Sequence, residues 1–331
     1  MDTILVTGGA GYIGSHTVRL LAEKGYSIVV IDNLIYGHES ALIDKEVLFE
    51  KGDIGDIKFI ENIFTTYSIT AVLHFAAFAF VGESVTNPAK YYQNNLAAPL
   101  VLLNAMVKHN CSKIIFSSTC ATYGNPLYIP IDENHPQNPI NPYGQSKLML
   151  EKVIVDYEKA YAIKYVFLRY FNASGAAPDG KTGEDHTPET HLIPLVLEAA
   201  QGLRKNITVF GTDYDTKDGS CVRDYIHVLD LAEAHILALE YLTKETSSLA
   251  CNLGTGIGYS VKEVIRLAEE VTGLKVPVVY GDRREGDPPV LIAEPSLAKE
   301  KLGWVANYTD LKEVIKTAWA WHNNKNKGKY N

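Results

Sequence analysis

The stretch Ile4-Leu5-Val6-Thr7-Gly8-Gly9-Ala10-Gly11-Tyr12-Ile13-Gly14 decides the fold. Its apolar first part predicts a buried parallel strand, and the glycines let that strand turn sharply into a helix over about residues 13–24. Gly8 allows the tight turn, Gly11 lets the backbone approach a pyrophosphate, and Gly14 lets helix and strand pack closely. The positive end of the helix dipole then points at the phosphates, so the stretch predicts a dinucleotide cradle.

A second apolar strand, over residues 27–31, ends in Asp32, about twenty residues beyond the cradle. A carboxylate at this place in a dinucleotide-binding unit hydrogen-bonds both ribose hydroxyls. It also repels a 2′-phosphate, so the sequence favours NAD over NADP. The alternative is that Asp32 only ends a strand.

Strand-like and helix-like segments alternate through the first half of the chain, which predicts a doubly wound parallel sheet with right-handed crossovers. Ligands of such sheets lie beyond the carboxyl ends of the strands. The residues that we expect at the cofactor for these reasons are Gly8, Gly11, Tyr12, Ile13, Gly14, Asp32, Asn33, Asp53, Ile54, Phe75, Ala76, Ala77, Ser117 and Tyr170.

The pattern loosens after about residue 175, where Pro and Gly become frequent. We therefore expect an α/β fold in which residues 1–175 form a Rossmann domain, joined by a crossover strand from later in the sequence, and residues 176–331 form a smaller α+β substrate lobe. Arg223 and Arg284 lie near turn glycines of an acidic chain and are candidates for clamping an anionic substrate such as a diphosphate. Surface solvation or internal ion pairing is the alternative for both.

Tyr143 and Lys147 lie four residues apart just after Asn141-Pro142, a helix start, so phenol and ammonium share one helix face. A free tyrosine has a pKa of about 10 and is a poor base at neutral pH. The lysine and a positive nicotinamide ring both favour the phenolate, which lowers that pKa toward the working pH. Thr119, at the end of a preceding strand, can bond the substrate hydroxyl. This arrangement predicts proton removal from an alcohol during redox chemistry.

The chain has 331 residues and a net charge of −8, without a long basic run, which argues against nucleic acid or anionic membranes as partners. No stretch approaches the roughly 18 apolar residues of a membrane span. The four cysteines have no C-x-x-C spacing and are typical of reduced thiols in a cytoplasmic protein.

His186 and His191, with Glu184 and Asp185, raise the possibility of a metal site. Pro188 interrupts the helical spacing that a zinc-binding histidine pair would need, and no further ligands cluster nearby in the sequence. We therefore expect no metal.

With these residues in place, the chain resembles the extended short-chain dehydrogenases/reductases, and most closely the UDP-glucose 4-epimerase family, along nearly its whole length. The resemblance rests on the glycine stretch and on the words His74-Phe-Ala-Ala77, Phe116-Ser-Ser-Thr119, Pro142-Tyr-Gly-Gln-Ser-Lys147, Leu168-Arg-Tyr-Phe-Asn172, Arg223-Asp-Tyr-Ile-His227 and Arg283-Arg-Glu-Gly-Asp287. It implies interconversion of UDP-glucose and UDP-galactose through a 4-keto intermediate with tightly bound NAD. Tyr143 would remove the proton from the fourth hydroxyl of the sugar.

The resemblance also implies the remaining site residues and a homodimer. Asn95, Tyr143 and Lys147 join the cofactor residues, and the dimer would use helices near residues 88–109 and 147–161. The residues that it places at the UDP-sugar are Thr119, Tyr143, Asn172, His191, Leu192, Thr208, Phe210, Arg223, Arg284, Asp287 and Leu291. Because Leu291 stands where glucose-restricted relatives carry a tyrosine, the resemblance extends to the N-acetylated pair, UDP-GlcNAc and UDP-GalNAc.

Two positions depart from the family pattern. Ala79 stands where bacterial relatives often carry a lysine near the cofactor, so one cofactor hydrogen bond is expected to be missing. Pro99 falls inside the expected long helix and removes the amide that would bond the carbonyl of Asn95.

Two other functions compete with epimerisation. Nucleotide-sugar 4,6-dehydratases and decarboxylases of the superfamily share the cradle and the Tyr/Lys pair, but similar dehydratases carry an Asp-Glu pair where this chain has Cys120 and Ala121. A non-catalytic NAD-binding protein would be expected to have lost Tyr143 or Lys147, and both are present.

Overall fold

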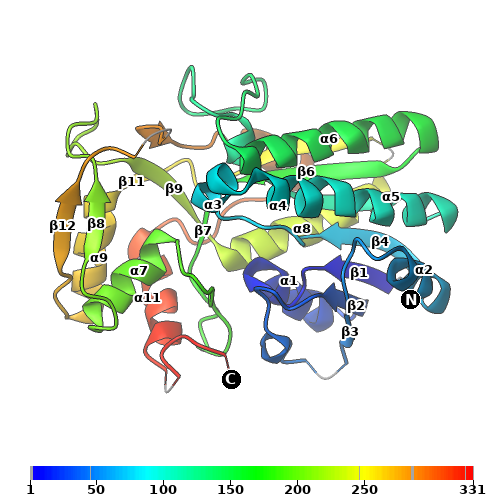
Figure 1. The fold of residues 1–331 in the computed structure, drawn as a ribbon, viewed down its shortest axis with the longest axis horizontal. Coiled ribbons are helices and arrows are strands. Elements are labelled where there is room, and N and C mark those ends of the chain that lie inside the picture. Colours follow the sequence, from blue (N-terminus) through cyan, green and yellow to red (C-terminus); the bar gives the residue numbers. More distant parts are fainter. Residues whose placement is uncertain (1–2, 45, 246, 285–286, 325, 331) are drawn as a thin grey trace.

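The computed structural model describes residues 3–44, 46–245, 247–284, 287–324 and 326–330. Its largest element is a sheet of seven parallel strands in the order β10-β6-β5-β4-β1-β2-β3 (Figure 1). The strands are β1 (Thr3–Thr7), β2 (Ser27–Asp32), β3 (Leu48–Lys51), β4 (Ile69–His74), β5 (Lys113–Thr119), β6 (Lys164–Tyr170) and β10 (Leu249–Leu253). The doubly wound fold expected from the sequence is confirmed.

Helices cover both faces of this sheet, because its central strands are apolar on both sides. On one face α1 (Tyr12–Glu23), α8 (Val228–Lys244) and α10 (Ser296–Leu302) pack over a core that includes Val18, Leu231 and Trp304. On the other face α2 (Ile57–Thr66), α5 (Ala98–Lys108) and α6 (Pro142–Tyr161) pack over a core that includes Ile60 and Leu102. The sheet is therefore a rigid platform whose carboxyl edge holds the loops.

The prediction of one continuous helix from Pro88 to His109 is wrong. The segment consists of α4 (Pro88–Tyr92), a π-helical turn η2 (Gln93–Ala97) and α5, preceded by the short α3 (Val81–Thr86). Pro99 lies in the first turn of α5, where its missing amide cannot bond the carbonyl four residues earlier. The backbone widens into the π-turn just ahead of it.

The second part of the fold lies at one end of the large sheet (Figure 1). It contains a small sheet of β11 (Gly258–Ser260), β9 (Val222–His227), β13 (Val290–Leu291) and β7 (Asn172–Ser174), in which β9 pairs with the other three. A two-stranded parallel ladder joins β8 (Ile207–Phe210) to β12 (Val278–Gly281). Helices α7 (Leu192–Ala200), α9 (Val261–Thr272) and α11 (Leu311–His322) share a core with β8 and β9.

The chain passes between the two parts several times. After β9, helix α8 and strand β10 return to the large sheet, where β10 pairs with β6, and α10 later packs over the same core. The division at residue 175 stays a prediction. Single turns of 3-10 helix, η1 (Glu39–Ala41) and η3 (Cys120–Thr122), complete the secondary structure of the described residues. Among those residues no helix combines the length and apolar character that crossing a membrane demands.

Candidate active site

A cavity of about 980 Å³ lies at the carboxyl edge of the large sheet and extends to the smaller part of the fold. Loops that follow β1, β2, β4, β5 and β6 form one side of it, and residues of α7, β8, β9 and β13 form the other. This is the position at which doubly wound sheets bind ligands. Its residues come from segments far apart in the sequence, so the site exists only in the folded chain.

The glycine stretch forms a close-packed turn on one wall of this cavity. Gly8 has a positive φ of 71°, and a Cβ atom there would lie 2.5 Å from the backbone nitrogen of Ala76. A Cβ atom on Gly14 would lie 2.3 Å from the carbonyl oxygen of Gly8. Gly11 begins helix α1 as its N-cap. The roles expected for Gly8 and Gly14 therefore have a steric cause in this structure.

Asp32 ends β2 and points into the turn. Its carboxylate accepts hydrogen bonds from the backbone amides of Leu34 (2.9 Å) and Ala10 (3.1 Å). Burial nevertheless raises the pKa of Asp32 above its ordinary value. A buried carboxylate of this kind is stabilised by further donors such as ribose hydroxyls, and the cradle and Asp32 together fit a dinucleotide.

Most of the expected cofactor residues line the cavity, but three do not. Asp53 caps a turn instead, since its carboxylate accepts from Asn33 Nδ2 (2.9 Å) and from the amide of Gly55 (2.7 Å). Ser117 is covered by its contacts with Tyr170 and Lys147. The residues that do line it are Gly8, Gly11, Tyr12, Ile13, Gly14, Asp32, Asn33, Ile54, Phe75, Ala76, Ala77, Tyr143, Lys147 and Tyr170.

Asn95 is the third, and its place at the cofactor stays a prediction. The side chain is buried, accepts a hydrogen bond from the amide of Phe78 (2.8 Å) and donates to the carbonyl oxygen of Phe78 (2.9 Å) and to Ser146 Oγ (3.2 Å). It therefore holds the loop after β4 in place, and its neighbour Asn94 lines the cavity instead. Ala79, at the departure from the family pattern, is exposed on this loop.

The expected catalytic residues lie together where β5 and α6 meet. Asn141 caps α6 by accepting from the amide of Gly144 (2.9 Å), so Tyr143 lies in the first helical turn. Lys147, one turn further on, is buried and donates from Nζ to the carbonyl oxygen of Ser117 (2.9 Å). The hydroxyl oxygen of Thr119 accepts from the amide of Ala121 (3.1 Å), which leaves the hydroxyl proton free to donate.

Burial dominates the electrostatics of this triad. It raises the pKa of the Tyr143 phenol well above its usual value, Tyr170 adds to the rise, and a contact with Thr119 opposes it. Burial lowers the pKa of Lys147 from 10.5 to about 7, although Glu151 opposes the change. The expectation that the lysine and a positive nicotinamide ring together draw the pKa of Tyr143 toward neutrality concerns the NAD-bound enzyme and stays a prediction.

All residues expected at the UDP-sugar line the same cavity: Thr119, Tyr143, Asn172, His191, Leu192, Thr208, Phe210, Arg223, Arg284, Asp287 and Leu291. Arg223, on β9, pairs with Asp287 through Nη2 and donates from Nη1 to the carbonyl oxygen of Val222 (2.8 Å). The guanidinium of Arg284 lies 4.4 Å above the ring of Phe210. Glu285 and Gly286, which separate Arg284 from Asp287 in the motif, lie outside the described residues.

Several cavity residues, among them Tyr36 and Phe80, were not anticipated from the sequence. Together with Phe78, which follows strand β4, they form an aromatic group in the cavity, with ring centroids of Tyr36 4.9 Å from Phe80 and 5.5 Å from Phe78. Arg204, beyond the end of α7, adds a cation on the substrate side. Tyr36 could have been found as a residue just beyond the carboxyl end of β2, and Arg204 as a third arginine close to a turn glycine.

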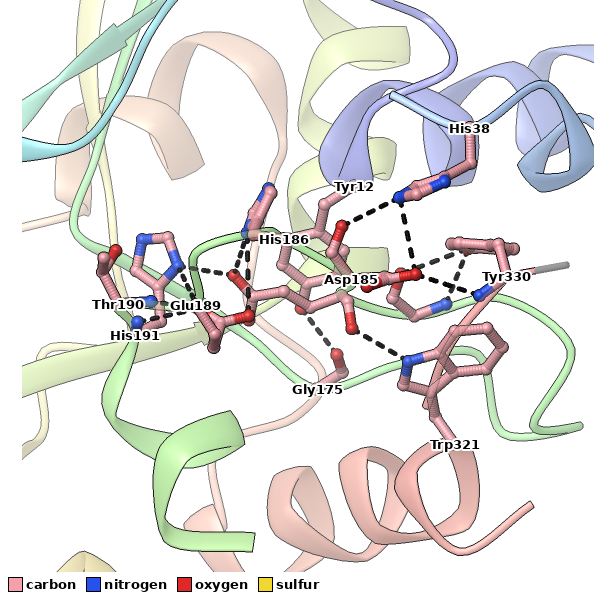
Figure 2. Close-up of polar contacts among 12 residues, drawn as sticks. Tyr12, His38, Gly175, Asp185, His186, Glu189, Thr190, His191, Trp321 and Tyr330 are labelled. Carbon is pink, nitrogen blue, oxygen red and sulfur yellow. Dashed lines mark hydrogen bonds and ion pairs between the residues drawn. The ribbon is translucent and has the colours of Figure 1, made fainter. Parts of the chain in front are cut away.

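The sequence argument against a metal site assumed that no further ligands cluster near His186 and His191, and this assumption is wrong. Glu184, His186, Glu189 and His191 bring one possible ligand atom each within 4.8 Å of the others (Figure 2). Asp185, considered with them, points away and binds Lys329 Nζ (2.7 Å) and the amide of Tyr330 (2.9 Å). The segment is irregular and not helical, so helical spacing does not apply to it, and the rings of His186 and His191 lie 5.6 Å apart across Pro188.

Comparison with known proteins agrees with this site. The family model described as "NAD dependent epimerase/dehydratase family" matches residues 4–254. The UDP-glucose 4-epimerase of Halalkalibacterium halodurans is 54% identical over 319 residues, which are 96% of this chain and 95% of that protein. The crystal structure of UDP-glucose 4-epimerase from Brucella ovis in complex with NAD has a TM-score of 0.94 and 52% identity, covering 96% of this chain and 98% of that one.

A third relative was solved with both ligands. The structure of UDP-glucose 4-epimerase from Bifidobacterium longum in complex with NAD⁺ and UDP has a TM-score of 0.94 and 40% identity, over 99% of this chain and all of the other. The chain belongs to the NAD-dependent epimerase/dehydratase family. Within that family its relatives are UDP-glucose 4-epimerases, as the sequence motifs indicated, and the expected cofactor, NAD, is confirmed.

Proposed function

We propose that the protein interconverts UDP-glucose and UDP-galactose, as a UDP-glucose 4-epimerase that keeps NAD bound and passes through a 4-keto sugar. The observation that carries this proposal is the meeting of three groups in one cavity. The glycine cradle with Asp32 lies on one side, the Tyr143/Lys147/Thr119 group lies in the middle, and Arg223 and Arg284 lie on the other side. A nucleotide cofactor and a nucleotide sugar can therefore meet at one phenol.

The cradle fits a dinucleotide because a side chain at Gly8 or Gly14 would collide with backbone. The backbone amides at the start of α1 are free to bind a pyrophosphate. Bound NAD supplies the hydride acceptor and a positively charged nicotinamide ring. Without Lys at position 79, the cofactor is held by the cradle, Asp32 and the catalytic group.

The chain's own residues carry the proton chemistry. Tyr143 accepts the proton of the fourth hydroxyl of the sugar at its phenol oxygen, and Thr119 holds the same hydroxyl by a hydrogen bond. Lys147 stabilises the phenolate as an ammonium one helical turn away. Because its pKa is about 7, Lys147 also exchanges its own proton near neutral pH.

The arginines hold the diphosphate. Arg223 is already oriented by Asp287, and the planar guanidinium of Arg284 lies on Phe210, so both present donors without large loss of side-chain freedom. A sugar that is anchored only through its diphosphate can turn its other face toward the cofactor, which an epimerase requires. A dehydratase would need carboxyl groups beside the sugar, and the residues after Thr119 that line the cavity are Cys120 and Ala121.

We also propose that the enzyme accepts the N-acetylated pair, UDP-GlcNAc and UDP-GalNAc, with lower activity. Leu291 lies on β13 opposite Arg223 of β9, and both side chains line the cavity. A leucine leaves space that a tyrosine at the same position would fill. Pocket volume of this kind changes discrimination by about 1–3 kcal/mol.

We propose a homodimer built on α5 and α6, and a cytoplasmic location. On these two helices, the apolar side chains of Leu103, Met106, Leu150 and Ile154 pack in the chain's own core. The partly exposed Leu100 and Val153, with Tyr161 at 55% exposure, remain for a partner. The cytoplasmic location is supported by four free, buried cysteines.

The test is incubation of the purified protein with UDP-galactose and no added cofactor, with the sugar signals followed by NMR. UDP-glucose should appear, and Tyr143→Phe should reduce its rate by about 10²–10⁴-fold while NAD stays bound. Tyr143→Phe retaining more than a tenth of the wild-type rate would show that another group is the base. Elimination of one water molecule from the sugar, leaving a 4-keto-6-deoxy product, would instead identify a dehydratase.

A further inference from the structure

The segment between β7 and α7 carries a cluster of four side chains that the proposed reaction does not use as a unit. We propose that Glu184, His186, Glu189 and His191 form a binding site for one divalent transition-metal ion. The site lies in the cavity wall beside Tyr12 of the cradle, and one of its members, His191, is also expected at the UDP-sugar, so its test measures metal binding and not activity. Figure 2 shows His186, Glu189 and His191 converging on one point from the same turn of chain.

The distances within the cluster suit a small metal ion. Ligand atoms of a tetrahedral ion with bonds of ~2.0–2.2 Å lie ~3.3–3.6 Å apart. His186 Nδ1 lies 3.2 Å from Glu184 Oε1 and 3.8 Å from Glu189 Oε2, and His191 Nδ1 lies 3.4 Å from Glu189 Oε1. The contact between His191 Nδ1 and Glu184 Oε1 is shorter, 2.6 Å. The His191 side chain is 39% exposed and has room to move outward.

The second observation is that these atoms approach one another without hydrogen-bond geometry. Glu184 Oε1, His186 Nδ1 and His191 Nδ1 are all buried atoms, and within the described part of the chain they meet as ion pairs that lack regular hydrogen-bond geometry. The Glu184 side chain is only 5% exposed. Buried polar atoms are normally satisfied. Three such atoms aimed at one point are the arrangement in which ligands face a common ion.

The charge and the surroundings of the cluster fit a divalent ion. Two carboxylates balance a charge of +2, and imidazole with carboxylate is a ligand set for Zn²⁺ and neighbouring first-row ions. Glu189 Oε1 is fixed by the amides of Thr190 (2.7 Å) and His191 (2.8 Å). Trp321 Nε1 holds the carbonyl oxygen of Glu184 (2.9 Å). Such supporting contacts orient the ligands of metal sites.

Protons are the competing occupant. Burial lowers the pKa of His191, but the carboxylates of Glu184 and Glu189 outweigh it and raise that pKa well above its usual value. A cluster held by protons alone would therefore show the same closeness of the four side chains. Metal and protons compete for the same nitrogen atoms, so affinity for a metal must fall as the pH falls.

The experiment uses the full chain with its bound NAD, stripped of metal by a chelator and then dialysed against Zn²⁺. Wild type should retain about one ion per chain, as measured by elemental mass spectrometry, and thermal unfolding should shift upward with Zn²⁺. His186→Gln and Glu189→Gln should each weaken binding by at least ~10–100-fold, the loss typical of perturbing even the partners that orient metal ligands. Both variants should lose the Zn²⁺-dependent thermal shift.

His109→Gln is the matched control, because His109, at the end of α5, also pairs its Nε2 with a carboxylate, Glu61 Oε1 (3.0 Å), and does not line the cavity. This variant should bind Zn²⁺ as wild type does. Co²⁺ in place of Zn²⁺ should give the visible bands of a tetrahedral ion only where the cluster is intact. Wild type that binds no Zn²⁺, or that binds it no more tightly than His186→Gln and Glu189→Gln, would overturn the proposal in favour of a proton-held cluster.

Discussion

Replacing Lys147 by methionine should make the nucleotide-free protein more stable near neutral pH while removing its activity. The lysine is 3% exposed, and burial lowers its pKa from 10.5 to about 7. Among the described residues, the Nζ atom of Lys147 donates one hydrogen bond, to the carbonyl oxygen of Ser117. Methionine keeps a flexible apolar stem of similar length and removes the titrating group.

The sign follows from where each state binds its proton. Above pH 10.5 Lys147 is neutral in both the folded and the unfolded chain. As the pH falls from there toward 7, the unfolded chain gains a proton that the folded chain does not, so the free energy of unfolding decreases. Below pH 7 both states are protonated and the loss is constant, on the order of 5 kcal/mol for a shift of this size.

Urea unfolding of the nucleotide-free wild type and Lys147→Met, at about pH 7 and about pH 9.5, measures the effect. Between these two values wild type should gain roughly 3 kcal/mol relative to the variant, since each pKa unit is worth about 1.4 kcal/mol. Taking the difference between the two proteins cancels other titrating groups that are common to both. If the free energies of unfolding of the two proteins changed equally between these pH values, the lowered pKa of the buried Lys147 would be refuted.

Three further predictions concern the cofactor, the sugar and the assembly. Gly14→Ala should purify without NAD, because its Cβ atom would lie 2.3 Å from the carbonyl oxygen of Gly8; the ultraviolet spectrum of heat-released nucleotide measures this, and full retention would contradict the packing. Leu291→Tyr should suppress epimerisation of UDP-GlcNAc more than of UDP-glucose, and an unchanged ratio in an NMR assay would show that Leu291 is not the gate. Light scattering at micromolar concentration should give the mass of two chains, and a monomer would exclude the proposed interface on α5 and α6.

The sequence was sufficient for those parts of the site that depend on local rules. The spacing of Gly8 and Gly14 and that of Tyr143 and Lys147 reflect contacts between near neighbours, and Asp32 is recognised by its position at the end of a strand. The apolar strands and their alternation with helices likewise predicted the parallel sheet, because burial on both faces imposes a continuous apolar pattern.

Predictions made from residues close in the sequence failed where contacts between distant segments determine how a side chain is placed. Asn95 was expected at the cofactor from the family resemblance, and its hydrogen bonds to the backbone of Phe78, seventeen residues away, could not be read from the sequence. The convergence of Glu184, His186, Glu189 and His191 was missed because their spacing was judged against a helix, and in an irregular turn side chains at any spacing can converge. No motif shows the burial of Tyr143, which raises the pKa of its phenol in the nucleotide-free chain.

The π-turn η2 has a consequence for helix phase. Such a turn holds about one residue more than an α-turn, and one residue corresponds to a rotation of ~100° about the helix axis. Tyr91 of α4, whose hydroxyl binds the carbonyl oxygen of Phe80 (2.7 Å) and Glu83 (2.8 Å), therefore faces the loop after β4, while α5 keeps its apolar side on the sheet. Deleting one residue from η2 would give a straighter helix, but it would rotate Tyr91 away from the loop that it supports.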